Sequence, residues 1–246
     1  MHRLGKKSLS AATQDLPGGG LALLFGASGG IGSALSKRLR ADSRFAGVVA
    51  LSRSGSPPLD LLDEASIAAA ADNVAAMGLD LRLLIVATGV LEGEGCFAEK
   101  SWRHLDAQAL AQSFAVNTIG PALLIKHFMP LLPRSGRCVF AALSARVGSI
   151  GDNRLGGWYG YRAAKAALNQ ILRSAAVELK RSRPEAICVA LHPGPVDTGL
   201  TAGFGKHGLE VQTPDIAAAR IINTFDRLRA ADSGGFFDQH GRGIPW

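Results

Sequence analysis

The sequence predicts an α/β protein built on a doubly wound parallel sheet with helices on both faces. Three observations predict it: short apolar runs alternate with helical stretches, a glycine-rich turn joins the first run to the first helical stretch, and no linker or repeat divides the chain. The length of 246 residues suits one large domain. We therefore expect a single domain over residues 21–246, preceded by a mobile leader over residues 1–20.

The apolar runs have the length and composition of buried parallel strands. In chain order they cover residues 21–25, 48–51, 83–87, 138–143 and 187–191. The helical stretches cover residues 31–40, 66–77, 105–132 and 161–181, and the third is expected to bend near Pro121. In the first helical stretch Ile31, Leu35 and Leu39 share one face, as expected of a helix that packs on a sheet.

One interval is too short for this pattern. Residues 59–62 form a further candidate strand, yet only residues 53–59 separate it from the strand at 48–51. A parallel crossover needs about a dozen residues or more. Either a crossover helix has been lost here, or residues 59–62 are not a parallel neighbour; we favour the lost helix.

Composition and charge argue against two classes of protein. A hydrophobic share of 47% with 19% charged residues describes a folded chain and not a disordered one. The net charge is +7, but the densest basic cluster (Lys180, Arg181 and Arg183) falls at a predicted helix end, where cations complement the helix dipole. Without a basic stripe we expect no nucleic-acid partner. An anionic small ligand such as a phosphorylated cofactor explains the charge more economically.

The remaining composition favours a cytoplasmic protein. Three widely separated cysteines, without a C-x-x-C pair, indicate neither a disulfide framework nor a zinc site, and we expect no metal. No apolar run reaches the roughly 18 residues of a membrane span. The leader lacks the apolar core of a signal peptide.

The glycine-rich turn predicts a dinucleotide site of the Rossmann type. It runs from Gly26 to Gly32 between the first strand and the first helix, where glycines allow a tight turn and a close approach of backbone to a pyrophosphate. Free N–H groups at the helix start would face the phosphates. The alternative is a turn without a ligand. The cofactor-binding residues expected here are Gly26, Ser28, Gly29, Gly30, Ile31 and Gly32.

The end of the second strand favours NADP(H) over NAD(H). NAD enzymes usually place an acidic residue there for the ribose 2′-OH, and this chain has Ser52 and Arg53 instead. A guanidinium suits a 2′-phosphate. The alternative for Arg53 is an ordinary surface arginine. Asp60 is expected either near the adenine or as a helix-capping acid.

Tyr161 and Lys165 form the candidate catalytic pair. Four residues apart at the start of a predicted helix, they share one face. A phenol has an ordinary pKa of about 10, and a nearby ammonium is expected to lower that pKa. A tyrosine tuned in this way can give a proton to a carbonyl oxygen or accept one in reverse.

With these motifs in order, the chain resembles the short-chain dehydrogenase/reductase family from residue 21 to its end. Residues 147–153 and 235–238 resemble the C-factor or sniffer-like carbonyl reductases within it. The resemblance implies that Asn117 holds a water of the proton relay and that Lys165 also bonds the nicotinamide ribose. It further implies cofactor contacts from Gly89, Pro193, Gly194, Val196 and Thr198.

Two departures from the family pattern concern the site. The family's Asn-Asn-Ala-Gly is here Val86-Ala87-Thr88-Gly89, which keeps only the glycine. The family's Ser-Ser pair reads Ser144-Ala145, so alanine can occupy the place of the catalytic serine. Ser144 is the expected donor to the substrate oxygen if the strand end shifts by one residue, and Ser149 is the reserve candidate.

The leading hypothesis is therefore an NADP(H)-dependent oxidoreductase acting on a small carbonyl compound or secondary alcohol. The glycine-rich residues 199–213 are expected to form a mobile lid. In the family the two long helices pair between subunits, which implies a homodimer or homotetramer. The alternatives are a dinucleotide-binding sensor or signalling protein with weak or no catalysis, motivated by Ala145, and a basic nucleic-acid protein.

Overall fold

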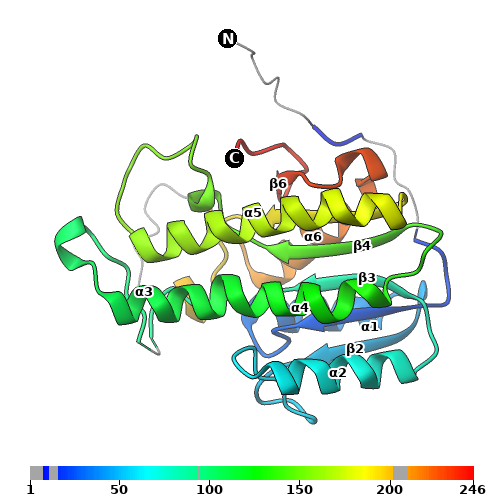
Figure 1. The fold of residues 1–246 in the computed structure, drawn as a ribbon. Helices are drawn as coiled ribbons and strands as arrows, with labels where there is room; N and C mark the ends of the chain where they lie inside the picture. Colours follow the sequence, from blue (N-terminus) through cyan, green and yellow to red (C-terminus); the bar gives the residue numbers. More distant parts are fainter. Residues whose placement is uncertain (1–7, 11–15, 94, 202–209) are drawn as a thin grey trace.

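The fold is a single parallel sheet between two layers of helices (Figure 1). The computed structural model describes residues 8–10, 16–93, 95–201 and 210–246. Within these residues a six-stranded sheet has the order β2-β1-β3-β4-β5-β6, with every neighbouring pair parallel. The strands are β1 (Gly20–Phe25), β2 (Phe45–Leu51), β3 (Leu81–Val86), β4 (Cys138–Leu143), β5 (Ala186–His192) and β6 (Phe236–Asp238). The predicted fold class is confirmed.

The helices divide between the two faces of the sheet. Helices α2, α4 and α5 contribute Ile67, Leu124 and Leu168 to one buried cluster, and α1 and α6 contribute Leu35 and Ile221 to the other. In Figure 1 the first group lies in front of the sheet and the second behind it. The helices are α1 (Gly30–Arg40), α2 (Glu64–Ala76), α3 (Ala107–Phe114), α4 (Gly120–Phe128), α5 (Tyr159–Ser182) and α6 (Pro214–Arg227).

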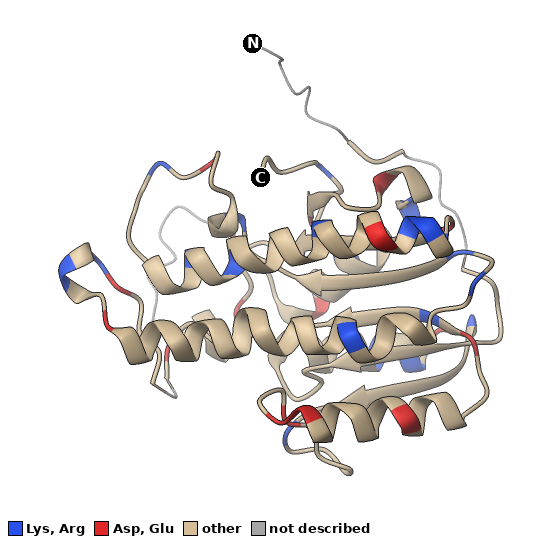
Figure 2. Cartoon of the chain, viewed as in Figure 1, with Lys and Arg blue, Asp and Glu red and all other residues tan. Residues whose placement is uncertain are grey.

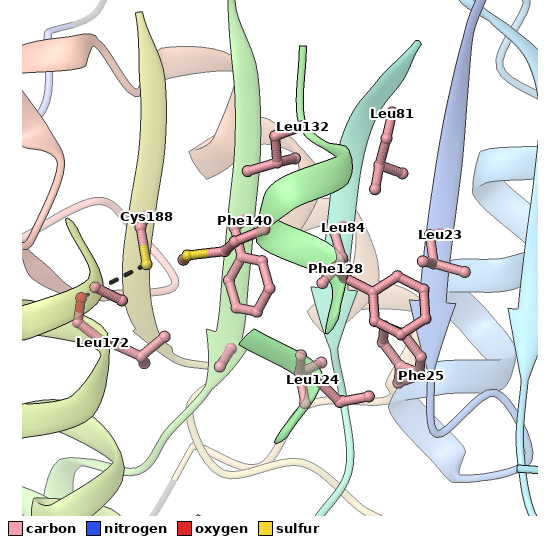
Figure 3. Close-up of a cluster of buried hydrophobic side chains, with 14 of the residues drawn as sticks. Leu23, Phe25, Leu81, Leu84, Leu124, Phe128, Leu132, Phe140, Leu172 and Cys188 are labelled. Atoms are coloured by element: carbon pink, nitrogen blue, oxygen red, sulfur yellow. Dashed lines mark hydrogen bonds between the residues drawn. The ribbon is translucent and has the colours of Figure 1, made fainter. Parts of the chain in front are cut away.

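Burial on both faces explains why the strands read as continuous apolar runs. In β1, Leu21, Leu23 and Phe25 belong to the front cluster, whereas Ala22 and Leu24 belong to the rear one. Figure 3 shows the front cluster, where the ring of Phe25 meets that of Phe128 edge-on with centroids 4.9 Å apart. Side-chain alternation thus fills two cores from one strand.

The long predicted helix over residues 105–132 is interrupted where a bend was expected. A π-helical turn over Ala115–Ile119 separates α3 from α4, and the Gly120 N–H donates to the Ala115 carbonyl five residues back. Pro121 has no N–H, so the α-helical bond to the Asn117 carbonyl cannot form. The wide turn accommodates that missing bond.

The favoured lost helix near residue 59 was wrong. Residues 59–62 form no strand, and the crossover from β2 to β3 uses α2, whose N-cap Asp63 accepts a hydrogen bond from the Ala65 N–H. Leu59 and Leu61 are apolar because they are buried in the front core from a loop, not because they lie in the sheet.

Part of the predicted leader contacts the folded domain. Leu9 and Leu16 are buried in the rear core, and the Leu9 N–H donates to the Gly241 carbonyl at 2.9 Å. Residues 1–7 and 11–15 lie outside the described residues. The division of the chain at residue 20 stays a prediction.

The sheet order places an opening at a defined position. In the sheet, β2 lies on one side of β1 and β3 lies on the other side. The loops after β1 and β3 therefore diverge, and ligands of doubly wound sheets bind at such a switch point, outside the carboxyl ends of the strands.

We predict that Gly32→Ala destabilises the fold far more than Gly29→Ala. A Cβ at Gly32 would lie 2.0 Å from the Gly26 carbonyl oxygen, whereas the nearest atom to one at Gly29 is 3.4 Å away. The expected loss in free energy of unfolding is about 3 kcal/mol or more for Gly32→Ala and about 1 kcal/mol or less for Gly29→Ala. Urea unfolding checks this, and equal losses would contradict the close approach of α1 to the turn.

Candidate active site

A cleft of about 660 Å³ opens at the predicted switch point. Its volume is in the range of small-molecule and cofactor sites. The residues that line it come from the turn after β1, the end of β2, the segments around residues 60 and 90, and Thr198–Leu200. Of the predicted cofactor-binding residues, it brings together Gly26, Ser28, Gly29, Gly30, Ile31, Gly32, Ser52, Arg53, Asp60, Gly89 and Thr198.

The glycine turn is shaped for close contact with a ligand. Gly26 has φ +82°, a left-handed conformation that favours glycine, and a Cβ at Gly30 would lie 2.7 Å from Thr198 Cγ2. Helix α1 begins without a side-chain cap at Gly29 and without an acidic residue in its first turn. Its first N–H groups are thus available to an anion, and the helix dipole favours one.

The end of β2 places polar groups on the opposite rim of the cleft. Ser52 is buried, and its carbonyl accepts hydrogen bonds from the Gly55 and Leu59 N–H groups, which fixes the loop. Arg53 lines the cleft with an exposed side chain. Asp60 also lines it, and one of its carboxylate oxygens accepts from the Leu62 N–H.

The segment after β3 contains a polar atom that has no hydrogen-bond partner among the described residues. Thr88 Oγ1 is buried and makes no hydrogen bond to the described residues, although Thr88 lines the cleft. A buried hydroxyl without a partner is costly unless a ligand or water satisfies it. With the glycine cradle and the open end of α1, this atom makes the cleft fit a dinucleotide.

Tyr161 and Lys165 lie together beside this cleft. Lys165 Nζ is 5.7 Å from the centroid of the Tyr161 ring and donates to the Leu143 carbonyl at 3.0 Å. A Cβ at Gly89, which lines the cleft, would be 3.5 Å from that same Nζ. The predicted pairing of the two side chains on one helix face is what the structure shows.

The expected direction of the Tyr161 pKa was wrong. Burial raises the pKa of the Tyr161 phenol, and burial also lowers the pKa of Lys165 to about 8. Loss of water disfavours each charged form, and it is the cause of both shifts. Near neutral pH the phenol therefore keeps its proton.

Asn117 lies in the π-helical turn and holds the segment after β3. Its side-chain oxygen accepts from the Val90 N–H at 3.1 Å, and its amide nitrogen donates to the Val90 carbonyl at 2.8 Å. The amide nitrogen also donates to Ser113 Oγ at 3.4 Å, so this side chain is committed to shaping the cleft wall. The water of the proton relay that Asn117 is predicted to hold would therefore have to bind an atom of Asn117 outside this side-chain amide.

The hydroxyls of the two candidate serines are both engaged. Ser144 Oγ donates to Asn169 Oδ1 at 2.7 Å, and Ser149 Oγ donates to the Pro245 carbonyl. Ser144 follows β4 directly, with Ala145 next in extended backbone. These contacts do not identify either serine as catalytic.

The segment after β5 is held in place by glutamine side chains. Gln212 donates to the Pro193 carbonyl at 2.6 Å, and Gly194 has φ +81° against the side chain of Gln239. Val196 is buried and does not line the cleft, whereas Thr198 does. Residues 202–209 of the predicted lid lie outside the described residues.

Sequence reasoning missed two buried polar residues at this site. Asn169, the partner of Ser144, lies four residues after Lys165, so helical spacing alone could have found it. Glu99 is buried against the first turn of α5, and no local pattern marks it because its partner Gly160 is 61 residues away.

Other classes of site receive no support from the described residues. Among them there is no group of three or more His, Cys, Asp or Glu side chains arranged to hold a metal. None of the described helices combines the length and hydropathy needed to cross a bilayer. In the view of Figure 2, Lys and Arg are interspersed with Asp and Glu along the described part of the ribbon.

Comparison with known sequences gives consistent matches. The pattern of the family described as enoyl-(acyl carrier protein) reductase matches residues 26–226. The 1-hydroxy-2-glutathionyl-2-methyl-3-butene dehydrogenase of Rhodococcus sp. (strain AD45) is 31% identical over 241 residues, covering 91% of this chain and 98% of the relative. C-signal of Myxococcus xanthus is 34% identical over 143 residues, covering 58% of this chain and 81% of the relative.

Solved structures share the fold along nearly the whole chain. The NADPH-bound carbonyl reductase from chicken fatty liver superimposes with a TM-score of 0.83 and 28% identity, covering 96% of this chain and 97% of that one. Carbonyl reductase Sniffer of D. melanogaster superimposes with a TM-score of 0.78, covering 93% and 100%. At 23% identity, the likeness to Sniffer is evidence for the fold alone.

We predict that Lys165→Met stabilises the protein at neutral pH. The folded-state pKa of Lys165 is about 8, below its ordinary 10.5, so below pH 8 the folded chain carries a buried charge that the unfolded chain keeps in water. This cost is full below pH 8 and disappears as the pH rises to 10.5. The free energy of unfolding should rise by roughly 1–3 kcal/mol at pH 7.

Urea unfolding at pH 7 and at pH 10.5 measures this difference. Lys180→Met, on the exposed face of the same helix, is the control and should change little at either pH. A Lys165→Met protein that is less stable at pH 7, or equally shifted at both pH values, would contradict the desolvation of Lys165.

Proposed function

The chain belongs to the short-chain dehydrogenase/reductase family of oxidoreductases, and on that premise we propose that it transfers a hydride between NADP(H) and a carbonyl compound or secondary alcohol. The observation that carries the proposal is the juxtaposition of Tyr161 and Lys165 beside a cleft that fits a dinucleotide. Tyr161 is the proposed general acid and base.

The cofactor-binding roles follow from which residues line the cleft. The residues of the glycine turn and the N-terminus of α1 would bind the pyrophosphate, and Ser52 and Arg53 would bind the 2′-phosphate. Thr198 lines the cleft and would hold the nicotinamide end, whereas Pro193, Gly194 and Val196 do not line it and are proposed for the same role from the family resemblance alone. The NADPH found in the related carbonyl reductase supports this choice of dinucleotide. When bound, the dinucleotide supplies or accepts the hydride.

The proton is moved by the chain itself. At neutral pH the Tyr161 hydroxyl holds a proton, which it can give to a carbonyl oxygen. Burial raises the pKa of Tyr161 and makes the phenol a weaker acid, so the transfer depends on stabilising the phenolate. The phenolate that remains is stabilised by the ammonium of Lys165, which is charged below a pH of about 8. In the reverse direction the phenolate accepts the alcohol proton.

Ser144 is the proposed donor to the substrate oxygen. Its present acceptor is the side-chain amide of Asn169. Rotation of that amide would present its nitrogen to Ser144 and leave the hydroxyl proton for substrate, with loss of the 3.4 Å hydrogen bond from Asn169 Nδ2 to the Gly148 carbonyl. Ser149 is the weaker candidate because it donates to a backbone carbonyl that cannot rotate in this way. We propose a homodimer or homotetramer as the assembly.

A second candidate is a dinucleotide-binding sensor or signalling protein with weak or no catalysis. Ala145 in place of a serine and the engagement of both nearby hydroxyls favour it. The name of one relative, C-signal, also supports a signalling role. The presence of Tyr161 and Lys165 side by side favours the enzyme.

We predict that Tyr161→Phe lowers kcat for carbonyl reduction by about 10²-fold or more, because the proton donor is lost. NADPH affinity should change by less than about twofold, since the phenyl ring still fills the space. Tyr159→Phe is the matched control and should retain kcat. Steady-state kinetics on a panel of aldehydes and ketones and an NADPH titration measure both.

Equal losses in the two phenylalanine variants would reject Tyr161 as the acid and base. If the unaltered chain binds NADPH but reduces no member of the panel, the sensor candidate is favoured. If it binds no dinucleotide at all, both candidates are rejected.

We predict that Arg53→Ala weakens NADPH binding by about tenfold or more and NADH binding by less than about twofold. The variant removes a charge-assisted bond to a group that only NADPH carries. Arg40→Ala, which removes an exposed arginine at the far end of α1, should leave both dissociation constants unchanged. Fluorescence titration measures them, and equal losses for the two dinucleotides would refute the role of Arg53.

A further inference from the structure

Helix α5, which carries Tyr161 and Lys165, begins without a cap of its own. Its N-cap residue is Trp158, with φ +52° and no side-chain hydrogen bond to the helix. Helices usually begin with Ser, Thr, Asp or Asn at this position. A bulky residue with positive φ is strained, so surrounding contacts must hold Trp158 in place.

Glu99 supplies those contacts from the loop between β3 and α3. Its two carboxylate oxygens lie 3.1 and 3.2 Å from the Gly160 N–H, and its carbonyl oxygen accepts from the Trp158 N–H. Only 2% of Glu99 is exposed. One residue therefore satisfies two donors of the first turn of α5.

A negatively charged side chain such as Glu99 suits the N-terminal end of α5. The Gly160 N–H and the positive end of the α5 dipole stabilise its carboxylate, which forms no salt bridge within the described part of the chain. Carboxylate bonds to N–H groups at a helix start are charge-assisted and stronger than neutral ones.

Gly160 provides the space for the carboxylate. A Cβ at this position would lie 2.9 Å from Glu99 Oε1 and 3.3 Å from Leu110 Cδ2. The first turn of α5 can therefore approach both Glu99 and α3. Any other residue would displace the carboxylate or tilt the helix.

These contacts bear directly on the phenol. Tyr161 follows Gly160, and its ring meets the Trp158 ring edge-on with centroids 6.5 Å apart. We propose that Glu99 is a positioning residue: by fixing the first turn of α5, it sets the place of Tyr161 relative to Lys165. The catalytic consequence rests on the proposed function, whereas the contact itself does not.

The test compares Glu99→Ala and Glu99→Gln with matched variants at Asp106. Asp106 caps α3 in the same region, its Oδ1 accepting from the Ala109 N–H at 2.8 Å, but α3 carries no residue of the proposed proton transfer. Glu99→Gln keeps one acceptor and the side-chain shape, so it reports on the role even if Glu99→Ala does not fold.

Two measurements are made on each protein. Amide exchange followed by NMR, without cofactor or substrate, should show Gly160 exchanging about tenfold faster in Glu99→Gln. The kcat for carbonyl reduction should fall about tenfold in Glu99→Gln and further in Glu99→Ala, with NADPH affinity within about twofold of the unaltered chain. Asp106→Asn and Asp106→Ala should speed exchange in α3 and leave kcat within about twofold.

Unchanged Gly160 exchange, or an unchanged kcat in an active Glu99→Gln protein, would overturn the inference. Parallel losses of kcat and NADPH affinity would overturn it as well, because they indicate general damage to the fold. If the unaltered chain reduces no carbonyl, the proposed function fails, and the exchange of Gly160 still decides whether Glu99 fixes the first turn of α5.

Discussion

The removal of Lys165 from water is the constraint on which the rest of this site depends. An ammonium group buried at the end of a sheet needs space, a hydrogen-bond acceptor and interactions that stabilise its charged form. Gly148 provides the space, since a Cβ there would lie 2.8 Å from Lys165 Cβ, and the carbonyl at the end of β4 provides the acceptor. The position of α5 over the carboxyl edge of the sheet is therefore tied to one side chain.

Much of this arrangement could be predicted because it depends on local patterns. Strands buried on both faces appear as short apolar runs, and β4 was predicted at its observed bounds. The glycine turn was predicted from residues that are adjacent in sequence. Tyr161 and Lys165 were paired because helical spacing alone brings them together.

The parts that sequence reasoning missed depend on contacts between distant segments. Leu59 and Leu61 looked like a strand because burial under a loop leaves the same apolar signature as burial in a sheet. Strand β6 is only three residues long and lies at the sheet edge, which is too little for a pattern. The direction of the Tyr161 pKa needed the extent of burial, which a sequence does not contain.

The π-helical turn over Ala115–Ile119 has a consequence for how the chain tolerates changes in length. A wide turn accommodates one more residue than an α-helical turn, so deleting a single residue there would place Pro121 in an α-helical turn. In such a turn the proline ring clashes with the carbonyl four residues back, and the hydrogen bond to that carbonyl cannot form. This stretch should therefore accept substitutions far more readily than a shortening by one residue.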